Sequence, residues 1–380
     1  MTAPTANTSD SAPDSGTLTY GQAGVNYDQV DPIKLLAQQS AKATAAQLAQ
    51  HGLSEIAASR GESAYVLDAG PFYLASIVEC LGTKILVADA VYRETGKSYY
   101  AAIAQDTIAM AVNDLITVGA TPLIVQAYWA AGGSDWFADR QRAADLIAGW
   151  KAACETCGVS WGGGETPALA GVVESGTIDL GASCVGIVQP KSRLSLGDNL
   201  AVGNAIVMLA SSGIHANGVS LARKLAERLP RGYQTDIGNG HAFGDALLAP
   251  TVLYAPVTGA LAKAGIAVNY CVNITGHGWR KLLRHTSTLT YRIDTISPVP
   301  PVLAFMQREA KLDDTEAYGT LNMGAGFAFF VGQDQAAQTV AIARQCGVEA
   351  WIAGRVEAGP KQVIIEPVNV TYGADDLKLR

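Results

Sequence analysis

Residues 205–224 read AIVMLASSGIHANGVSLARK, an apolar run followed by a polar turn that opens into a helical pattern. The apolar run is short enough for a buried strand, so the polar turn falls between the end of a strand and the start of a helix. Backbone N–H groups are unpaired at a helix start and favour a phosphate or another anion. The stretch therefore predicts an α/β unit with an anion-binding turn, although a capped turn with an incidental histidine explains it equally well on its own.

Short apolar runs and longer helical patterns alternate along the rest of the chain, which indicates a mixed α/β layout. A polar break at 190–198 separates two such halves. We therefore predict a flexible tail at 1–18, an N-terminal domain at 19–189 and a C-terminal domain at 190–380. The predicted strands are 73–78, 85–88, 123–128, 177–188, 205–210, 326–331 and 363–365, and the predicted helices are 98–118, 136–157, 252–264 and 335–346.

The composition favours an enzyme-sized globule, because 380 residues with 49% hydrophobic and 16% charged side chains can fill two sizeable cores. The net charge of -7 argues against a general nucleic-acid surface, which needs clustered Lys and Arg. No apolar stretch has the length of a membrane span, and residues 1–19 lack the pattern of a secretory signal. We expect a soluble cytoplasmic protein. Cys154 and Cys157 lack a second pair at zinc-site spacing and are expected to be structural thiols.

A glycine, a hydroxyl and a lysine follow a predicted strand at Gly82-Thr83-Lys84, and Glu79 precedes them. Glycine lets the backbone approach a phosphate, the hydroxyl and the ammonium can contact its oxygens, and a carboxylate can hold Mg²⁺. The motif predicts a nucleotide and metal site. It lacks the spacing of a P-loop, so a plain strand end is the alternative.

Asp106, Asn113 and Asp114 interrupt an otherwise apolar predicted helix. Asp106 and Asn113 lie about two turns apart and share a face, and Asp114 lies roughly 80° further round. Buried carboxylates normally need a cation or a hydrogen-bonding partner. We therefore expect a metal or nucleotide role for this helix, with a structural ion pair as the alternative.

Two glycine-rich turns complete the pattern. The first, at 162–166, reads GGGET and is expected to be a flexible loop with one acidic side chain. The second, at 275–281, reads TGHGWRK and places two cations just inside the next predicted helix. Those cations could contact a phosphate or could form a solvated face.

Taken in order, these segments resemble the phosphoribosylformylglycinamidine cyclo-ligase (aminoimidazole ribonucleotide synthetase) family from about residue 20 to residue 365. The resemblance also includes the segments AGV at 23–25, GATP at 119–122, LAPT at 248–251 and NMGAG at 322–326. It implies a two-domain α+β fold, in which the N-terminal domains pair into a dimeric β-barrel and the C-terminal domain is α/β. It further implies ATP-dependent ring closure of formylglycinamidine ribonucleotide in purine biosynthesis, through a phosphorylated amide and with Mg²⁺.

The resemblance also implies roles for individual residues. ATP binding is implied for Gly82, Thr83, Lys84, Asp106, Asn113 and Asp114. Metal binding is implied for Glu79, Asp106 and Asp114. Binding of the nucleotide substrate is implied for Glu165, Thr166, Ser212, His215, Asn217, Thr275 and Gly276. Catalysis is assigned to His215, Lys84 and Asp114, with His215 as the candidate for proton transfer because imidazole titrates near neutral pH.

The chain departs from the family pattern at several of these motifs, which indicates a divergent subgroup. Glu79 and Cys80 stand where the family has an aspartate and a glycine, Gln22 stands where an aspartate is usual, and His277 replaces a glycine. The segment at 167–171 also lacks the acidic and proline pattern that usually follows Gly-Glu-Thr.

Two other functions remain open. One is a related ATP-dependent enzyme with a different acceptor, as in selenophosphate synthetase, thiamine-monophosphate kinase or hydrogenase-maturation proteins, of which the thiol-based members use a reactive cysteine. The other is a non-catalytic nucleotide-binding paralogue, for which Glu79 and Gln22 would be signs of decay. The joint presence of Lys84, Asn113, Asp114, His215 and Asn217 argues against decay.

Overall fold

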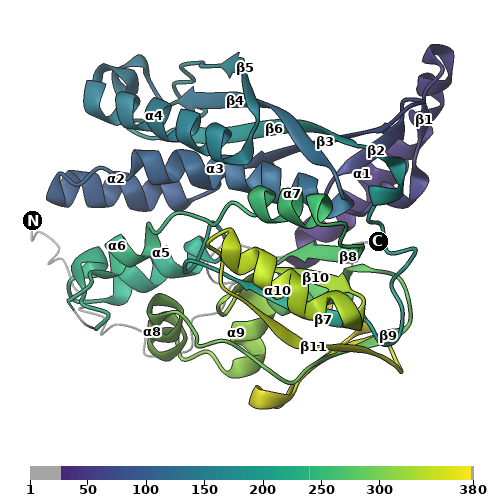
Figure 1. Cartoon of the computed structure of the whole chain (residues 1–380). Coiled ribbons are helices and arrows are strands. Elements are labelled where there is room, and N and C mark those ends of the chain that lie inside the picture. Colours follow the sequence, from purple (N-terminus) through teal and green to yellow (C-terminus); the bar gives the residue numbers. More distant parts are fainter. Residues whose placement is uncertain (1–26, 239, 378–380) are drawn as a thin grey trace, which may run out of the picture.

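The computed structural model describes residues 27–238 and 240–377, which form two layered halves stacked on each other (Figure 1). The predicted tail at 1–18 and the AGV segment at 23–25 lie outside the described residues. An N-terminal helix, α1 (Tyr27–Ala43), lies beside the first strands of the upper half. Among the residues that the structure describes, no helix is both long and apolar enough to cross a membrane.

The first half contains an open, six-stranded sheet in the order β1-β2-β3-β6-β4-β5. Helices α3 and α4 pack together and contact its strands, while α2 lies next to α3. Trp129, Trp150 and Trp161 fill the space between sheet and helices, with ring centroids 5.2 to 5.9 Å apart. The elements are β1 (Ser54–Glu55), β2 (Tyr65–Asp68), β3 (Tyr73–Cys80), α2 (Lys84–Thr95), α3 (Tyr100–Leu115), β4 (Thr121–Ala131), α4 (Arg140–Cys157), β5 (Ser160–Glu165) and β6 (Ile178–Val188).

The second half contains a seven-stranded sheet in the order β13-β12-β9-β11-β7-β10-β8. Its central strands β7 and β10 are almost wholly buried, and α10 packs against β7 and β11. The strands are β7 (Ala205–Ala210), β8 (Val268–Asn273), β9 (Leu289–Ile293), β10 (Ala325–Val331), β11 (Ala350–Ala358), β12 (Gln362–Ile365) and β13 (Val370–Gly373). The helices are α5 (Val219–Arg228), α6 (Phe243–Leu247), α7 (Ala255–Lys263), α8 (Pro301–Ala310), α9 (Asp314–Thr320) and α10 (Ala336–Gln345).

Most of the predicted elements are confirmed, with ends that shift by a few residues, but two predictions are wrong. The predicted strand at 85–88 is part of helix α2. This helix packs between α3 and the second half, so most of its side chains are buried. A short run of buried apolar residues has the same pattern in a helix as in a buried strand. The predicted loop at 162–166 is largely strand β5, which pairs in parallel with β4. A Cβ atom on Gly164 would lie 2.0 Å from the carbonyl oxygen of Ala127, so these glycines permit close strand contact rather than a free loop.

The first sheet does not close into a barrel within the described residues. Its face away from α3 and α4 exposes Val78 by 74%, Ile124 by 41% and Tyr128 by 41%. The barrel implied by the resemblance would need the sheet of a second copy.

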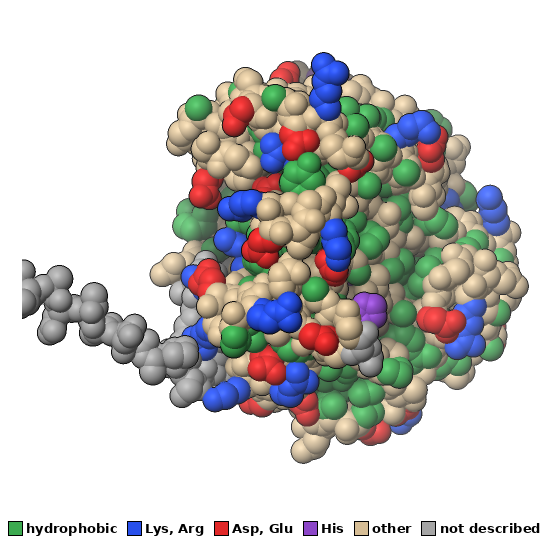
Figure 2. Space-filling view, turned by 90° about the vertical axis from the view of Figure 1, so that its left-hand side faces the viewer, with side chains coloured by type: hydrophobic (Ala, Val, Ile, Leu, Met, Phe, Trp, Pro, Cys, Tyr) green, Lys and Arg blue, Asp and Glu red, His purple; other side chains and the backbone are tan. Residues whose placement is uncertain are grey.

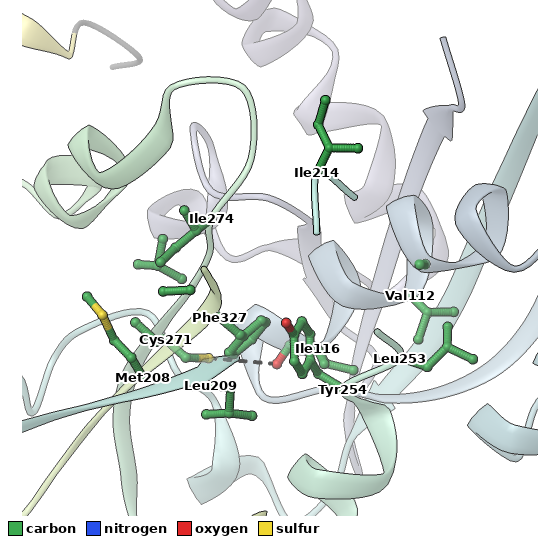
Figure 3. Packing of buried hydrophobic residues seen from close by; sticks show 14 of the residues in the cluster. Val112, Ile116, Met208, Leu209, Ile214, Leu253, Tyr254, Cys271, Ile274 and Phe327 are labelled. Carbon is green, nitrogen blue, oxygen red and sulfur yellow. Dashed lines mark hydrogen bonds between the residues drawn. The ribbon is translucent and has the colours of Figure 1, made fainter. Parts of the chain in front are cut away.

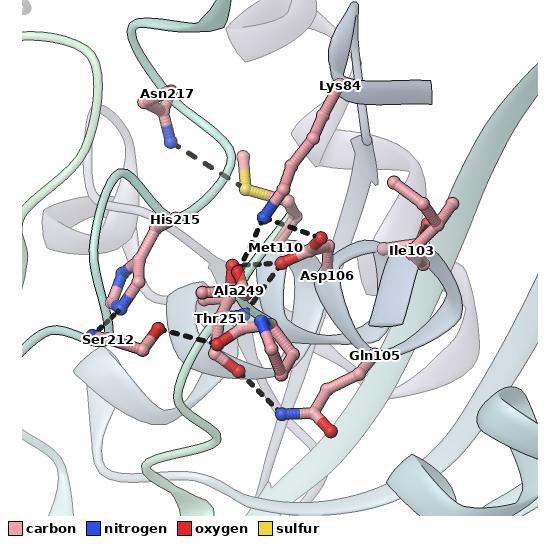
Figure 4. Close-up of polar contacts among 12 residues, drawn as sticks. Lys84, Ile103, Gln105, Asp106, Met110, Ser212, His215, Asn217, Ala249 and Thr251 are labelled. Carbon is pink, nitrogen blue, oxygen red and sulfur yellow. Dashed lines mark hydrogen bonds and ion pairs between the residues drawn. The ribbon is translucent and has the colours of Figure 1, made fainter. Parts of the chain in front are cut away.

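A buried ion pair lies where the two halves meet. Nζ of Lys84, at the start of α2, is 2.8 Å from Oδ2 of Asp106 on α3, and both side chains are fully buried. The same ammonium donates to the carbonyl of Ala249 at 2.9 Å, and Oδ1 of Asp106 accepts the backbone N–H of Thr251 at 2.7 Å (Figure 4). Burial lowers the pKa of Lys84 and raises the pKa of Asp106, whereas the attraction between them opposes both shifts.

Asn113 extends this polar contact along α3. Its amide donates to the carbonyl of Val252 at 2.8 Å, and its oxygen accepts the N–H of Tyr254 at 3.0 Å. We call the contacts of Lys84, Asp106 and Asn113 with residues 249–254 the polar seam. Apolar residues from both halves continue it as one buried cluster, including Val112, Ile116, Leu253, Tyr254 and Phe327 (Figure 3).

Removing one partner of the buried pair should strongly destabilise the protein. Lys84→Met leaves Asp106 buried without a cation, and we expect a loss of about 3 kcal/mol or more in the free energy of unfolding. Lys84→Met combined with Asp106→Leu should be less destabilising than Lys84→Met alone. Urea denaturation measures both. Lys151→Met, at the exposed Lys151–Glu155 pair, is the control and should cost under about 1 kcal/mol; equal losses at the two sites would contradict the prediction.

Candidate functional site

A cavity of about 360 Å³ opens between the two halves, and we call it the junction cavity. One wall comes from the first half, through α1, the turn before β2, strand β3 and helix α3. The other wall comes from the second half, through the turn before α5 and the loop after β8. Of the predicted site residues, the structure brings Glu79, Asp114, Asn217, Thr275 and Gly276 together here.

Two carboxylates occupy the wall formed by the first half. Glu79 lies near the end of β3, and Asp114 lies in the last turn of α3. The amide of Asn273, at the end of β8, donates to Oδ1 of Asp114 at 2.7 Å. Burial, and secondarily the negative charge of Asp114, raises the pKa of Glu79 to about 7. The charges of Lys281 and Arg284 act in the opposite direction and only partly offset these two effects.

The two carboxylates have the chemistry of a Mg²⁺ site. Among the described residues, no group of three or more His, Cys, Asp and Glu side chains is placed to hold a metal ion. Mg²⁺, however, is usually bound through only one or two carboxylates, together with substrate phosphates and water. Glu79 and Asp114 can provide the carboxylates. Asp106, the third predicted metal ligand, instead faces Lys84 in the polar seam.

The turn after β8 forms the opposite wall. The N–H of Gly278 donates to the carbonyl of Thr275 at 2.7 Å. Gly278 has a φ of +52°, and a Cβ atom there would lie 2.2 Å from the carbonyl oxygen of Tyr318, which excludes a side chain. Burial, and secondarily the charge of Lys281, lowers the pKa of His277 to about 3, so this imidazole is neutral.

His215 lies beside the seam and does not line the junction cavity (Figure 4). It is 5% exposed, has a φ of +58°, and its Nε2 accepts the backbone N–H of Ser212 at 3.2 Å. Burial, and secondarily the charge of Lys84, lowers its pKa to about 3. The ring is therefore neutral at physiological pH, so the premise of a near-neutral titration does not hold here. Its role in catalysis stays a prediction.

Several other predicted residues lie outside the junction cavity. Lys84, Asp106 and Asn113 are in the polar seam. Thr83 lies 3.3 Å from the hydroxyl of Ser220, between α2 and α5. Gly82 is exposed, with a φ of +74°, and the exposed Ser212 donates to the carbonyl of Pro250 at 2.6 Å.

Glu165 and Thr166 are exposed at the end of β5. Glu165 lines a second cavity of about 710 Å³ on the open face of the first sheet, together with Val78, Cys80 and Tyr128. The structure therefore separates these residues from Thr275 and Asn217, with which the sequence grouped them as substrate-binding.

Sequence reasoning missed Glu62 and Arg284, which also line the junction cavity. Nε of Arg284 lies 3.6 Å from Glu62, and one of its Nη atoms donates to the hydroxyl of Ser63 at 2.6 Å. Glu62 also accepts the hydroxyl of Tyr270, in β8, at 3.0 Å. Glu62 precedes every predicted element, so no sequence pattern marked it. The cations of the TGHGWRK turn were the only signal near Arg284.

The outer surface has no large patch of one sign in the view of Figure 2, where acidic and basic side chains are interspersed. This view agrees with the small net charge of -7 for the whole chain. The charged side chains that could bind a ligand are therefore sought inside the junction cavity rather than on this surface.

Known proteins resemble this chain over most of its length. The family model described as AIR synthase related protein, N-terminal domain, matches residues 61–188, and the corresponding C-terminal domain model matches residues 201–366. A phosphoribosylformylglycinamidine cyclo-ligase of Anaeromyxobacter dehalogenans (strain 2CP-1 / ATCC BAA-258) is 34% identical over 349 residues, or 90% of this chain and 96% of the relative. The enzyme of the same name from Burkholderia mallei (strain SAVP1) is 32% identical over 371 residues, or 94% of this chain and 99% of the relative.

Solved structures show the same fold at lower identity. Hydrogenase maturation protein HypE in complex with ATP has a TM-score of 0.58 at 15% identity, covering 82% of this chain and 86% of that chain. AaThiL complexed with AMPPCP and TMP has a TM-score of 0.55 at 15% identity, covering 82% and 89%. The chain carries both AIR synthase related domains in order and therefore belongs to the phosphoribosylformylglycinamidine cyclo-ligase family.

Proposed function

We propose that this protein catalyses the ATP-dependent ring closure of formylglycinamidine ribonucleotide to aminoimidazole ribonucleotide in purine biosynthesis. The observation that carries the proposal is its likeness to cyclo-ligases over nearly their full length. The junction cavity supports it, because carboxylates of one domain face a glycine-containing turn of the other. We also propose that the boundary between the two domains lies between residues 189 and 190.

In this reaction the formyl amide oxygen would take the terminal phosphoryl group of ATP, and an internal nitrogen would then attack the same carbon and displace phosphate. Asn217, Thr275 and the N–H of Gly276 would bind and orient the substrate in the junction cavity. Glu79 and Asp114 would hold Mg²⁺, which when bound supplies positive charge to the transferred phosphoryl group. A buried, preorganised cavity strengthens each of these contacts relative to water.

The remaining residues would act around this cavity. Gly82 and Thr83 would contact the nucleotide at the start of α2. Lys84, Asp106 and Asn113 would act as positioning residues, because the seam fixes the helix that carries Asp114. Direct roles for Lys84 and His215 in catalysis, and for Glu165 and Thr166 in substrate binding, remain predictions.

An ADP-release assay with formylglycinamidine ribonucleotide tests the function. We expect substrate-dependent ADP release from ATP and Mg²⁺, with little release for a panel of other small acceptors. ADP release with another acceptor alone would favour a different phosphoryl-transfer enzyme. ATP binding without any acceptor-dependent ADP release would favour a non-catalytic paralogue.

Asp114→Asn should lower kcat/KM in this assay by about 100-fold, because it removes one of the charges that hold Mg²⁺ while keeping the shape of the side chain. Asp334→Asn, at an exposed position in the second half, is the matched control and should keep its activity. Equal activity of the Asp114→Asn variant and the wild type would exclude Asp114 from the catalytic machinery.

Glu79 should make the stability of the metal-free protein depend on pH. Its pKa is raised to about 7 in the folded state, so the folded protein holds a proton that the unfolded chain releases at lower pH. The free energy of unfolding should therefore fall as the pH rises from about 4.5 to about 7, and Glu79→Gln should abolish this part of the pH dependence. Denaturation midpoints at about pH 5 and about pH 8 measure it. Adding Mg²⁺ at the higher pH should stabilise the wild type more than the variant; equal pH dependence in both proteins would contradict the prediction.

The open face of the first sheet supports a homodimer with a shared barrel. Val78 is 74% exposed on β3, and Ile124 and Tyr128 are each 41% exposed on β4, so this face presents apolar side chains to solvent on both sides of β6. A second copy would bury this face.

Val78→Lys should therefore convert a dimer into a monomer, which light scattering coupled to size-exclusion chromatography measures as a halved mass. Val202→Lys, at an apolar position in the second half that is 57% exposed, is the control and should leave the mass unchanged. A wild-type monomer, or a Val78→Lys variant that stays dimeric, would contradict this assembly.

A further inference from the structure

Lys281 carries a buried positive charge without a direct partner among the described residues. It lies in the short 3₁₀ helix Gly278–Arg284 that follows the turn after β8, lines the junction cavity and is 8% exposed. Its ammonium makes no hydrogen bond or ion pair with any residue that the structure describes. An ammonium ion held in a largely buried side chain without a protein partner costs free energy, because the surrounding protein replaces only part of its hydration.

Two neighbouring buried cations, Lys84 and Arg284, have direct protein partners, whereas Lys281 has none among the described residues. Lys84 contacts Asp106 and the carbonyl of Ala249. Arg284 lies near Glu62 and donates to Ser63 and to the carbonyl of Gly61. Both are held by the fold itself, so neither is available in the same way for a ligand.

The charges around Lys281 do not replace a direct partner. Burial, and secondarily the charge of Arg284, lowers the pKa of Lys281 to about 8, although Asp114 and Glu79 act in the opposite direction. The two carboxylates attract the ammonium from across the cavity without contacting it. The nearby His277 is neutral and contributes no charge.

The junction cavity therefore has two carboxylates on one wall and an unpartnered ammonium on the other. Glu79 and Asp114 lie on the wall of the first half, and Lys281 lies on the second half beside Thr275 and Gly276. The other charged lining residues are in ion pairs, Lys34 with Asp31 and Arg284 with Glu62. A phosphate that carries a divalent cation matches both walls, because the cation meets the carboxylates and an anionic oxygen meets the ammonium.

We propose that Lys281 is a phosphate-binding residue of the junction cavity, whose ammonium contacts an anionic oxygen of the bound ligand. This inference deepens the proposed function and rests on it for the identity of the ligand. The oxygen belongs either to the phosphate monoester of the nucleotide substrate or to the phosphoryl groups of ATP. The sequence left open whether the two cations of the TGHGWRK segment, Arg280 and Lys281, contact a phosphate or form a solvated face, and it assigned no site role to Lys281 itself.

Lys281→Met tests the proposal by calorimetric titration with two probes. The first probe is ribose 5-phosphate, a phosphate monoester, and the second is a non-hydrolysable ATP analogue with Mg²⁺. We expect at least one affinity to fall by roughly 10-fold or more, as for the loss of a hydrogen bond to a charged group. A loss confined to ribose 5-phosphate assigns the oxygen to the substrate, and a loss confined to the ATP analogue assigns it to the nucleotide. Lys263→Met, at an exposed position in the last turn of α7, is the matched control and should bind both probes normally.

The melting temperature separates this role from a structural one. Since methionine replaces a buried, unpartnered charge by an apolar side chain of similar length, Lys281→Met should melt at a higher temperature than the wild type. Unchanged affinity for both probes, or a lower melting temperature, would overturn the proposal. These readouts need no turnover, so an absence of cyclo-ligase activity in the wild type would refute the proposed function without deciding the role of Lys281.

Discussion

The ion pair between Lys84 and Asp106 is the constraint on which the arrangement of the two halves depends. Both charges are fully buried, and the backbone of residues 249–254 completes their hydrogen bonds. A charge in such a place is tolerated only when its partner is held in position. The two domains therefore cannot slide along α3 without exposing or unpairing these groups, and the relative placement of their sheets is fixed.

The junction cavity is a consequence of that placement. Asp114 lies two helical turns beyond Asp106 on the same helix, and the turn that carries Thr275 and Lys281 follows β8, which abuts the end of α3. Neither half could form the cavity alone, because Glu79 and Asp114 come from the first half and Thr275 and Lys281 come from the second. The polar seam contacts no ligand itself, but it fixes the distance between the two walls of the cavity.

Much of the fold could be predicted from the sequence, since periodicity identified most strands and helices and the order of motifs indicated the family. The site was less predictable. Lys84, Asp106 and Asn113 have the residue types of a nucleotide site, yet sequence cannot tell a buried polar contact from a ligand contact when both need the same groups. Glu62 and Arg284 come from different domains and are 222 residues apart in the sequence, so no local sequence pattern predicts their contact. The strand β5 was missed because its glycines are typical of loops and only pairing with β4 makes them extended.

The alternation of β3 has a consequence for regulation. Glu79 lines the junction cavity, whereas its neighbours Val78 and Cys80 are exposed on the open face of the same sheet. One strand therefore forms part of two surfaces, separated by the thickness of a single backbone. A partner that packed on the open face and shifted this strand would also shift a carboxylate of the cavity. By thermodynamic reciprocity, a ligand in the cavity would then change the affinity of the open face for that partner. The strand β3 would thus link any assembly on the open face to ligand binding in the cavity.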